Sequence, residues 1–367
     1  MSTSITQQNP ACPECGCQHT TRKGKRRNRL QTLQIFQCAE CLHRFTGEPG
    51  KNKTYPLKLI LESVSTFNLG YSLTETQRLL RQRFHRDIPV RTISSWLTEY
   101  RPLATYARLR SAGRKLFSSD TVIHSHTFHH QQVYRFQIHC SKLALLTQPD
   151  THPVTDSRID FTCLEDYLAS IKAHFPHQLF QETGHRSSKF PAKISPPVAR
   201  KENYATRLAR LALPTSPNNK KRHETLQRFM LINDSVTVAV EIPVFLTRAD
   251  VDYYRMRGFD LDFDSDVITG HIDFLQIRNG HIHILDYKPE ARKETHAHVQ
   301  LTIYALAIAR RTSLPLKAFK CGWFDENDYF EFFPLQGVYR RQTRPPRIAP
   351  SSLTLHGTSA TVEDELK

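Results

Sequence analysis

The sequence of 367 residues has no run of about 18 apolar residues and no cleavable signal segment. These two absences exclude the usual signatures of a membrane-spanning or a secreted protein. We therefore expect no membrane association and an intracellular, cytoplasmic location. No internal repeat is found, so nothing in the chain indicates a repeat array.

Cysteine is scarce outside one short segment, since five of the eight cysteines lie between positions 12 and 41. Clustered cysteines without a secretory context favour metal binding over disulfides. Two Cys-x-x-Cys pairs, 22 residues apart, predict a structural zinc ion held by Cys12, Cys15, Cys38 and Cys41. Cys17 is a spare cysteine that could replace a ligand, most simply Cys15. A redox pair is the alternative, but two pairs at this spacing favour a zinc ribbon.

Positive charge is concentrated at one end of the chain. Residues 1–115 contain 20 Lys and Arg against 7 Asp and Glu, whereas the remaining residues contain 31 against 28. A basic N-terminal third joined to a nearly neutral body indicates a module that binds a polyanion, most simply DNA. A solvated basic tail is the alternative for the run Lys23–Arg29, but it does not explain the pattern that follows.

Three helical segments are predicted after the ribbon. The first spans Pro56–Leu69, and Ser72-Leu-Thr-Glu75 is a capping-box pattern that opens the second. The third begins at Pro89, and its apolar stripe consists of Ile93, Trp96, Leu97 and Tyr100.

The ribbon, with its Cys-Pro-x-Cys-Gly knuckle and basic run, resembles the N-terminal ribbons of insertion-sequence transposases. The three helices resemble the helix-turn-helix domains that follow such ribbons. The resemblance implies that the third helix is the recognition helix, with contacts to DNA from Arg91, Thr92, Ser94 and Ser95. A small helical linker domain is the alternative.

The segment 270–288 predicts a β-hairpin that brings two carboxylates together. Strand-like alternation flanks Asn279-Gly280, which is a strong two-residue turn signal. If this turn closes the hairpin, Asp273 lies opposite Asp286. Like charges in this position repel each other, and a divalent cation would relieve the repulsion. Lys288 projects from the same face as Asp286. The alternative is that both aspartates end half-exposed strands and merely pair with the lysine.

The order Gly-x-x-Asp, Asp-x-Lys and Gln-x-x-x-Tyr resembles the PD-(D/E)XK nuclease superfamily, in particular its RecB-like exonuclease branch. The resemblance covers about residues 220–335. It implies a restriction-endonuclease-like core and a catalytic set of Glu241, Asp273, Asp286, Lys288, Gln300 and Tyr304. The helix expected at Lys221–Ile232 offers His223 and Glu224 as competitors of Glu241.

The same resemblance implies hydrolysis of a phosphodiester by a metal-activated water. Asp273, Asp286 and Glu241 would bind Mg²⁺ or Mn²⁺, because both ions prefer carboxylate oxygens. Lys288 would orient the water or stabilise negative charge, and Gln300 would position Lys288 or the water. An iron–sulfur cluster is excluded, since too few cysteines remain once the ribbon takes four.

Residues 116–219 are the least informative part of the sequence. The histidine-rich segment His124–His130 is interpreted as a polar loop, whereas Val133–Leu146 and Phe161–Phe175 are predicted to be helices. His185–Lys201 is interpreted as a linker.

We therefore predict a multidomain protein with a small zinc ribbon, an all-α helix-turn-helix domain and an α/β core with a mixed sheet flanked by helices. The predicted boundaries are 1–52 for the ribbon, 53–115 for the helix-turn-helix, 116–219 for the helical or linker region, 220–342 for the nuclease-like domain and 343–367 for a disordered tail.

The predicted function is a metal-dependent DNA nuclease linked to a mobile element, to repair or to defence. A non-catalytic DNA-binding regulator and a transposition protein with a nuclease-like fold are the alternatives. The sequence leaves open whether the substrate is single- or double-stranded and whether cleavage starts from ends or occurs internally.

Overall fold

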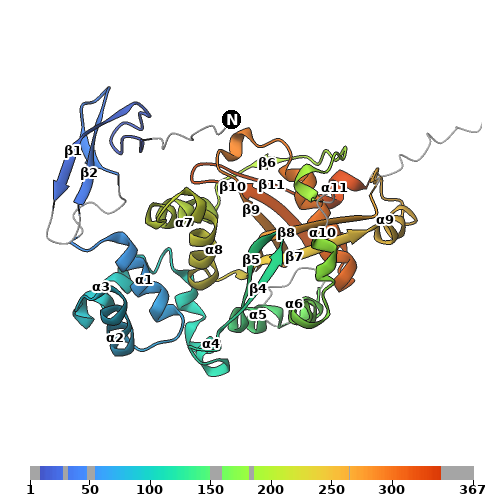
Figure 1. The fold of residues 1–367 in the computed structure, drawn as a ribbon, viewed down its shortest axis with the longest axis horizontal. Helices are drawn as coiled ribbons and strands as arrows, with labels where there is room; N and C mark the ends of the chain where they lie inside the picture. Colours follow the sequence, from blue (N-terminus) through green and yellow to red (C-terminus); the bar gives the residue numbers. More distant parts are fainter. Residues whose placement is uncertain are drawn as a thin grey trace, which may run out of the picture.

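The computed structural model describes residues 9–27, 32–47, 54–148, 159–181, 186–263 and 265–339. Figure 1 shows a small sheet and a helical unit on one side of a large sheet covered by helices. The strands are β1 (Thr20–Arg27), β2 (Thr32–Cys38), β3 (Arg44–Thr46), β4 (Ile123–His130), β5 (Gln132–His139), β6 (Ala199–Arg200), β7 (Thr237–Thr247), β8 (Val267–Arg278), β9 (His281–Tyr287), β10 (Phe319–Phe324) and β11 (Tyr329–Phe332). The helices are α1 (Leu57–Asn68), α2 (Leu73–Phe84), α3 (Val90–Tyr100), α4 (Arg110–Leu116), α5 (Cys140–Thr147), α6 (Thr162–His174), α7 (Tyr204–Ala212), α8 (Arg222–Asn233), α9 (Arg248–Arg255), α10 (Ala297–Thr312) and α11 (Pro334–Val338).

The large sheet has eight strands in the order β4-β5-β7-β8-β9-β10-β11-β6. Neighbouring strands are antiparallel except for β9 and β10, which are parallel. A parallel pair needs a crossover connection, and α10 supplies it. The mixed sheet flanked by helices agrees with the predicted restriction-endonuclease-like core.

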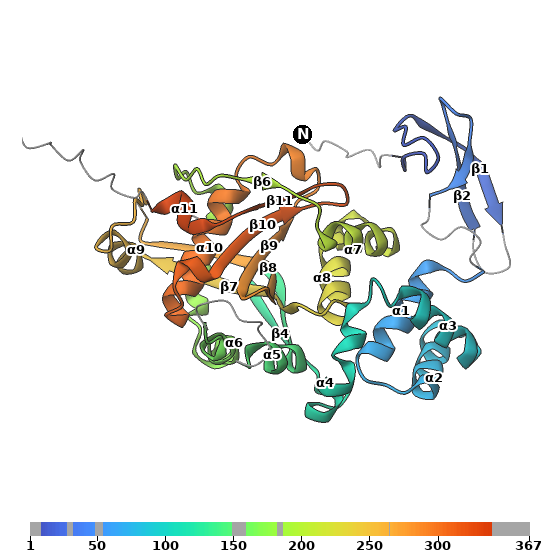
Figure 2. The ribbon, with the colours of Figure 1, turned by 180° about the vertical axis from the view of Figure 1, so that it is seen from behind.

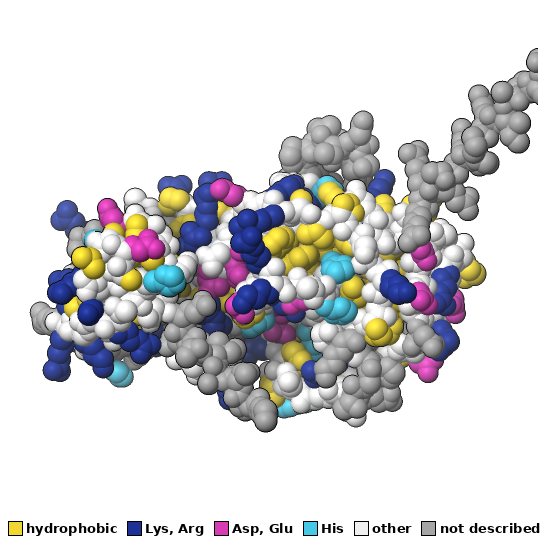
Figure 3. Space-filling model, turned by 90° about the horizontal axis from the view of Figure 1, so that it is seen from above, with side chains coloured by type: hydrophobic (Ala, Val, Ile, Leu, Met, Phe, Trp, Pro, Cys, Tyr) yellow, Lys and Arg dark blue, Asp and Glu magenta, His cyan; other side chains and the backbone are white. Residues whose placement is uncertain are grey.

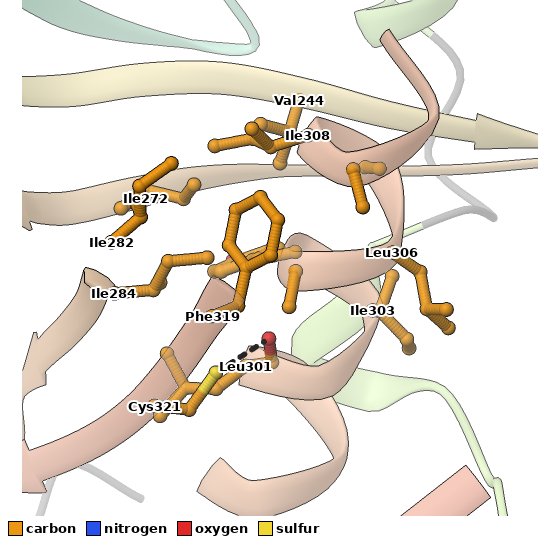
Figure 4. Close-up of a cluster of buried hydrophobic side chains, with 14 of the residues drawn as sticks. Val244, Ile272, Ile282, Ile284, Leu301, Ile303, Leu306, Ile308, Phe319 and Cys321 are labelled. Atoms are coloured by element: carbon orange, nitrogen blue, oxygen red, sulfur yellow. Dashed lines mark hydrogen bonds between the residues drawn. The ribbon is translucent and has the colours of Figure 1, made fainter. Parts of the chain in front are cut away.

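One face of the sheet packs against α10. Figure 4 shows Val244, Ile272, Ile284 and Phe319 from four neighbouring strands pointing toward apolar side chains of this helix. The Cys321 thiol donates a hydrogen bond to the Leu301 carbonyl over 3.4 Å, as the dashed line in Figure 4 shows. α10 is buried along nearly its whole length and contacts β7, β9 and β10.

The opposite face packs against α7 and α8. Phe274, Leu285 and Tyr287 belong to the cluster on this face. On β9, Leu285 and Tyr287 alternate with Ile284, which faces α10, as the period of two in a strand requires. On β8 the alternation breaks at Asp273, because Ile272 packs with the α10 face and Phe274 with the opposite one. Figures 1 and 2 both show α8 between the sheet and the helices α1–α3. α8 therefore contacts the sheet on one side and the N-terminal helical unit on the other.

The helical unit α1–α3 forms as predicted. Ser72 and Glu75 make the capping box at the start of α2, and Ile93, Trp96 and Tyr100 are buried along α3, whereas Leu97 is half-buried. The capping box fixes the residue at which α2 begins. The apolar stripe determines which face of α3 is buried.

Polar contacts join this unit to α8. The buried side chains of Asn68 and Asn233 share a hydrogen bond of 2.9 Å. Glu62 of α1 accepts two hydrogen bonds from Arg228 at 2.9 and 3.0 Å, and it also pairs with Arg83 of α2. The buried residues of α1–α3, α7, α8 and the sheet form one continuous cluster. The helical unit is thus packed on the core and is not tethered only by its linkers.

The predicted helix at Val133–Leu146 is wrong in its first half. Residues 132–139 form β5, and the segment His124–His130, interpreted as a loop, belongs to β4. The two strands form a hairpin, which turns at Gln131 with φ +61°. The helix predicted at Phe161–Phe175 is confirmed as α6.

Within the described residues, no helix is both long and apolar enough to cross a membrane. The predicted tail 343–367 lies outside the described residues, as does position 185 of the predicted linker.

Candidate active site

The β8–β9 hairpin has the register that its turn predicts. Asn279 and Gly280 have φ of +51° and +70°, as both central residues of a type I′ turn require. Arg278 therefore lies opposite His281, and pairing continues to Phe274 and Leu285. One step further, Asp273 and Asp286 come side by side.

The two aspartates differ in their charge preference. Burial and the neighbouring Asp273 raise the pKa of Asp286 well above its usual value. Burial alone would also raise the pKa of Asp273, but His223 outweighs it and holds this pKa well below the usual range. The Nδ1 atom of His223 lies 3.3 Å from Asp273 Oδ2, and the Tyr287 backbone N–H donates to the same oxygen over 3.0 Å. Asp273 is thus the firmly ionised member of the pair.

Lys288 is held between the aspartates and α10. Its Nζ atom lies 2.8 Å from Asp286 Oδ2 and donates a hydrogen bond to Gln300 Oε1 over 3.1 Å. Although burial opposes the charge, Asp286 raises the pKa of Lys288 above its usual value. The Gln300 amide donates to the Tyr304 hydroxyl over 2.7 Å, and Ser187 donates to the same hydroxyl over 3.1 Å. This chain fixes the position of the ammonium group.

Glu241 lies on β7 across from Asp273, between the pairs Val240–Phe274 and Ile242–Ile272. Its φ of +54° is unusual for a residue with a side chain and marks local strain. β5 stops pairing with β7 at Val240, directly before this residue. The Glu241 carboxylate accepts a hydrogen bond of 2.7 Å from Gln227 of α8. Burial, followed by Asp273, raises the pKa of Glu241 to about 7.

All six predicted catalytic residues line one cavity of about 460 Å³. Sequence reasoning left His223 undecided and missed Gln227, Tyr134 and Arg186, which also line it. Glu224 lines its rim, where it pairs with Lys221 and lies 3.8 Å from Arg135. His223 and Gln227 are four residues apart, so they lie on one face of the predicted helix, and this spacing could have identified both as candidates.

His271 also lines the cavity. Its ring stacks on Tyr134 with centroids 3.5 Å apart, and its Nε2 lies 2.9 Å from His130 Nδ1. Burial keeps the pKa of His271 well below its usual value, so it is a neutral wall of the cavity.

The donor set at the bottom of the cavity fits a hard divalent cation. Asp273 and Asp286 supply carboxylate oxygens, and Mg²⁺ is commonly bound by one or two carboxylates with water completing its shell. Burial and the negative charge of Asp273 raise the pKa of Asp286, and a bound cation would offset both effects. Among the described residues, three or more ligand atoms within 4.8 Å of one another occur only in the ribbon. Glu241, bonded to Gln227, is therefore not in direct contact with both aspartates.

The four predicted zinc ligands meet in the ribbon. The Sγ atoms of Cys12, Cys15, Cys38 and Cys41 lie within 4.8 Å of one another, an arrangement compatible with a zinc ribbon. Cys17 lies outside this set and groups with His19 and Glu40. Figure 3 shows Lys and Arg side chains gathered over the end of the molecule that holds the ribbon and α1–α3. On α3, Arg91, Ser94 and Ser95 are exposed, and Thr92 is half-buried.

Gly270 allows Tyr304 to reach the site. A Cβ atom at position 270 would lie 2.2 Å from Tyr304 Cε1 and 2.6 Å from its hydroxyl oxygen. Gly270→Ala should therefore push Tyr304 aside and lower the free energy of unfolding by about 1–3 kcal/mol, as overpacking in a core does. Urea unfolding measures this change. In the background of Tyr304→Ala the same substitution should cost much less; an equal cost in both backgrounds would contradict the contact.

A family model of the PD-(D/E)XK nuclease superfamily matches residues 174–336. No curated protein and no solved structure matches the chain. The match covers α8, the β7–β8–β9 strands, α10 and β10–β11, and it excludes the ribbon and α1–α3. The part of the chain that carries all six predicted catalytic residues is therefore similar to the PD-(D/E)XK nuclease superfamily, which indicates a nuclease.

Proposed function

We propose that this protein is a metal-dependent DNA nuclease that hydrolyses phosphodiester bonds in the cavity between β8, β9 and α10. The observation that carries the proposal is the joint position of Asp273, Asp286 and Lys288, with Gln300 holding the lysine. A charged lysine against two buried carboxylates is costly to bury without a functional reason.

Asp273 and Asp286 would hold Mg²⁺ or Mn²⁺, with Glu241 as the third acidic group. When bound, the ion would lower the pKa of a water ligand and neutralise phosphate charge. Lys288 donates hydrogen bonds to the phosphate oxygens where negative charge develops. Gln300 and Tyr304 restrict its position. The oxygen of water bonds to phosphorus, the ester P–O bond breaks, and a proton passes to the leaving oxygen.

The N-terminal modules would deliver this site to DNA. We propose that the four clustered cysteines hold a structural zinc ion. We also propose that four side chains at the start of α3, three exposed and one half-buried, contact DNA: Arg91, Thr92, Ser94 and Ser95. The concentration of positive charge in residues 1–115 supports this assignment. We also propose that the nuclease-like domain belongs to the RecB-like branch and that the ribbon and the helical unit are similar to transposase DNA-binding modules.

Digestion of linear and circular DNA with Mg²⁺ or Mn²⁺ tests the proposed activity. We expect cleavage that chelation abolishes and that Lys288→Ala abolishes as well. Lys293→Ala is the matched control, because Lys293 is exposed and pairs only with Glu290 among the described residues. A folded protein that binds DNA but leaves it intact in both ions would favour the non-catalytic regulator.

A further inference from the structure

The start of α8 separates the catalytic cavity from a second hollow of about 290 Å³. We call this second hollow the α8 groove; its walls include Lys58, Glu62, Arg83, Lys221, Glu224 and Arg228. Lys221 and Glu224 line both hollows, so the two spaces meet over one turn of the helix. The α8 groove leads from the cavity to α1 and α2.

Positive charge dominates this path. Glu62, the carboxylate on the α1 side, is already paired with Arg83 and Arg228. Glu224, at the start of α8 between the two hollows, pairs with Lys221. Lys58 and Lys220 are exposed and have no carboxylate partner within the described part of the chain. Arg186, on the other wall of the cavity, also has none there.

The reactive groups lie too deep for an intact duplex. Asp286 and Gln300 retain only 5% and 9% of their accessible surface. A cavity of about 460 Å³ has the size of a small-molecule site. An intact duplex is far bulkier than such a cavity, whereas a single strand can bring a phosphodiester down to the buried carboxylates. The β4–β5 hairpin narrows the entrance further, and Val133 on its rim is 67% exposed.

We infer that the cavity takes one unpaired nucleic-acid strand, whose phosphates run over Lys220 and along the α8 groove past Lys58 to α1 and α2. This inference rests on the proposed function and names its substrate. The helical unit and the cavity would then hold one continuous strand, which explains why α1–α3 are packed on α8. The aromatic pair Tyr134 and His271 on the opposite wall offers a surface for an unstacked base.

Binding of a labelled single-stranded oligonucleotide by the full chain tests the path without hydrolysis. In chelator, the double variant Lys58→Ala/Lys220→Ala should reduce the log–log salt slope by about 1.4, since each phosphate contact on a single strand contributes about 0.7. The matched control is Lys172→Ala/Lys317→Ala, which removes the same charge from exposed positions outside both hollows. Equal slopes for the two double variants would overturn the inference.

Cleavage separates this inference from the proposed function. Lys58→Ala, which changes the α8 groove and lies outside the cavity, should lower kcat/KM on single strands but leave hydrolysis of bis(4-nitrophenyl) phosphate unchanged, because this small diester fills only the cavity. Closed relaxed duplex circles should be cut far more slowly than single strands. Equal cleavage rates on duplex circles and single strands would refute the inference that the cavity takes an unpaired strand, but the proposed nuclease activity would stand. If the Lys58→Ala/Lys220→Ala variant has a reduced salt slope for binding but the wild type cleaves no DNA, the inferred strand path would be supported and the proposed nuclease activity refuted.

Discussion

Asp286→Asn should abolish DNA cleavage without destabilising the metal-free protein. The expected loss is at least about 10²–10³-fold, the effect of removing one preorganised electrostatic group from an active site. Burial and Asp273 raise the pKa of Asp286, so its negative charge is disfavoured in the metal-free protein. Asparagine has nearly the same size and carries no charge. Stability in chelator should therefore hold or rise while activity is lost.

The same reasoning predicts how stability depends on pH. Burial and Asp273 raise the pKa of Glu241 from 4.5 to about 7 in the folded protein, and the pKa of Asp286 is raised as well. The folded state then binds more protons than the unfolded state between these values. Both groups therefore stabilise the folded protein most at and below pH 4.5, and the contribution of Glu241 is lost as the pH rises from 4.5 through 7. Asp286→Asn should flatten this decline, and Mg²⁺ should reverse it at pH 8 in the wild type.

Urea unfolding in chelator and in Mg²⁺ measures both effects. Asp252→Asn on α9 is the matched control, because this exposed aspartate pairs with Arg255 and lies outside the cavity. It should leave cleavage and the pH profile unchanged. Wild-type activity in Asp286→Asn would mean that the catalytic site lies elsewhere in the chain.

The sequence predicts the centre of the site well because a two-residue turn fixes the register of the two strands that it joins. Once Asn279 and Gly280 close the hairpin, the partner of every strand residue follows, and Asp273 must meet Asp286. Lys288 and Gln300 then follow from strand and helix periods. Each of these inferences spans less than 30 residues of chain.

The wall of the cavity could not be predicted in this way. Val133, Phe136, Cys140 and Leu143 are spaced by three and four residues, which is the period of a helix. The first two nevertheless lie on β5, because pairing with β4 and β7 decides the local structure. The positive φ of Glu241 has no sequence signal either, since it arises where β5 leaves β7. Contacts between distant segments determine both features.

The last prediction concerns the ribbon, which should depend on zinc for its fold. Among described residues 9–27 and 32–47, only Cys12, Thr20, Phe36 and Cys38 are buried. Two of these four are proposed ligands, so almost no apolar core remains to stabilise the three strands. Hydrogen bonds from the backbone N–H groups of Cys41 and Glu40 lower the pKa of the Cys38 thiol to about 6, which favours the thiolate that binds metal.

Metal analysis of the full chain should find one zinc ion per molecule. Cys38→Ser should release it and remove hydrogen-exchange protection from β1–β3, because ligand binding and folding are coupled in such modules. Protection in α1–α3 should persist, since these helices share their core with α8 and the sheet and not with the ribbon. Cys17→Ser is the matched control and should keep the ion, as Cys17 lies outside the four-cysteine set. Zinc retained by Cys38→Ser but lost from Cys17→Ser would transfer the ligand role to Cys17.

The salt dependence of DNA binding should become less steep when the ribbon unfolds, because β1 carries much of the basic surface.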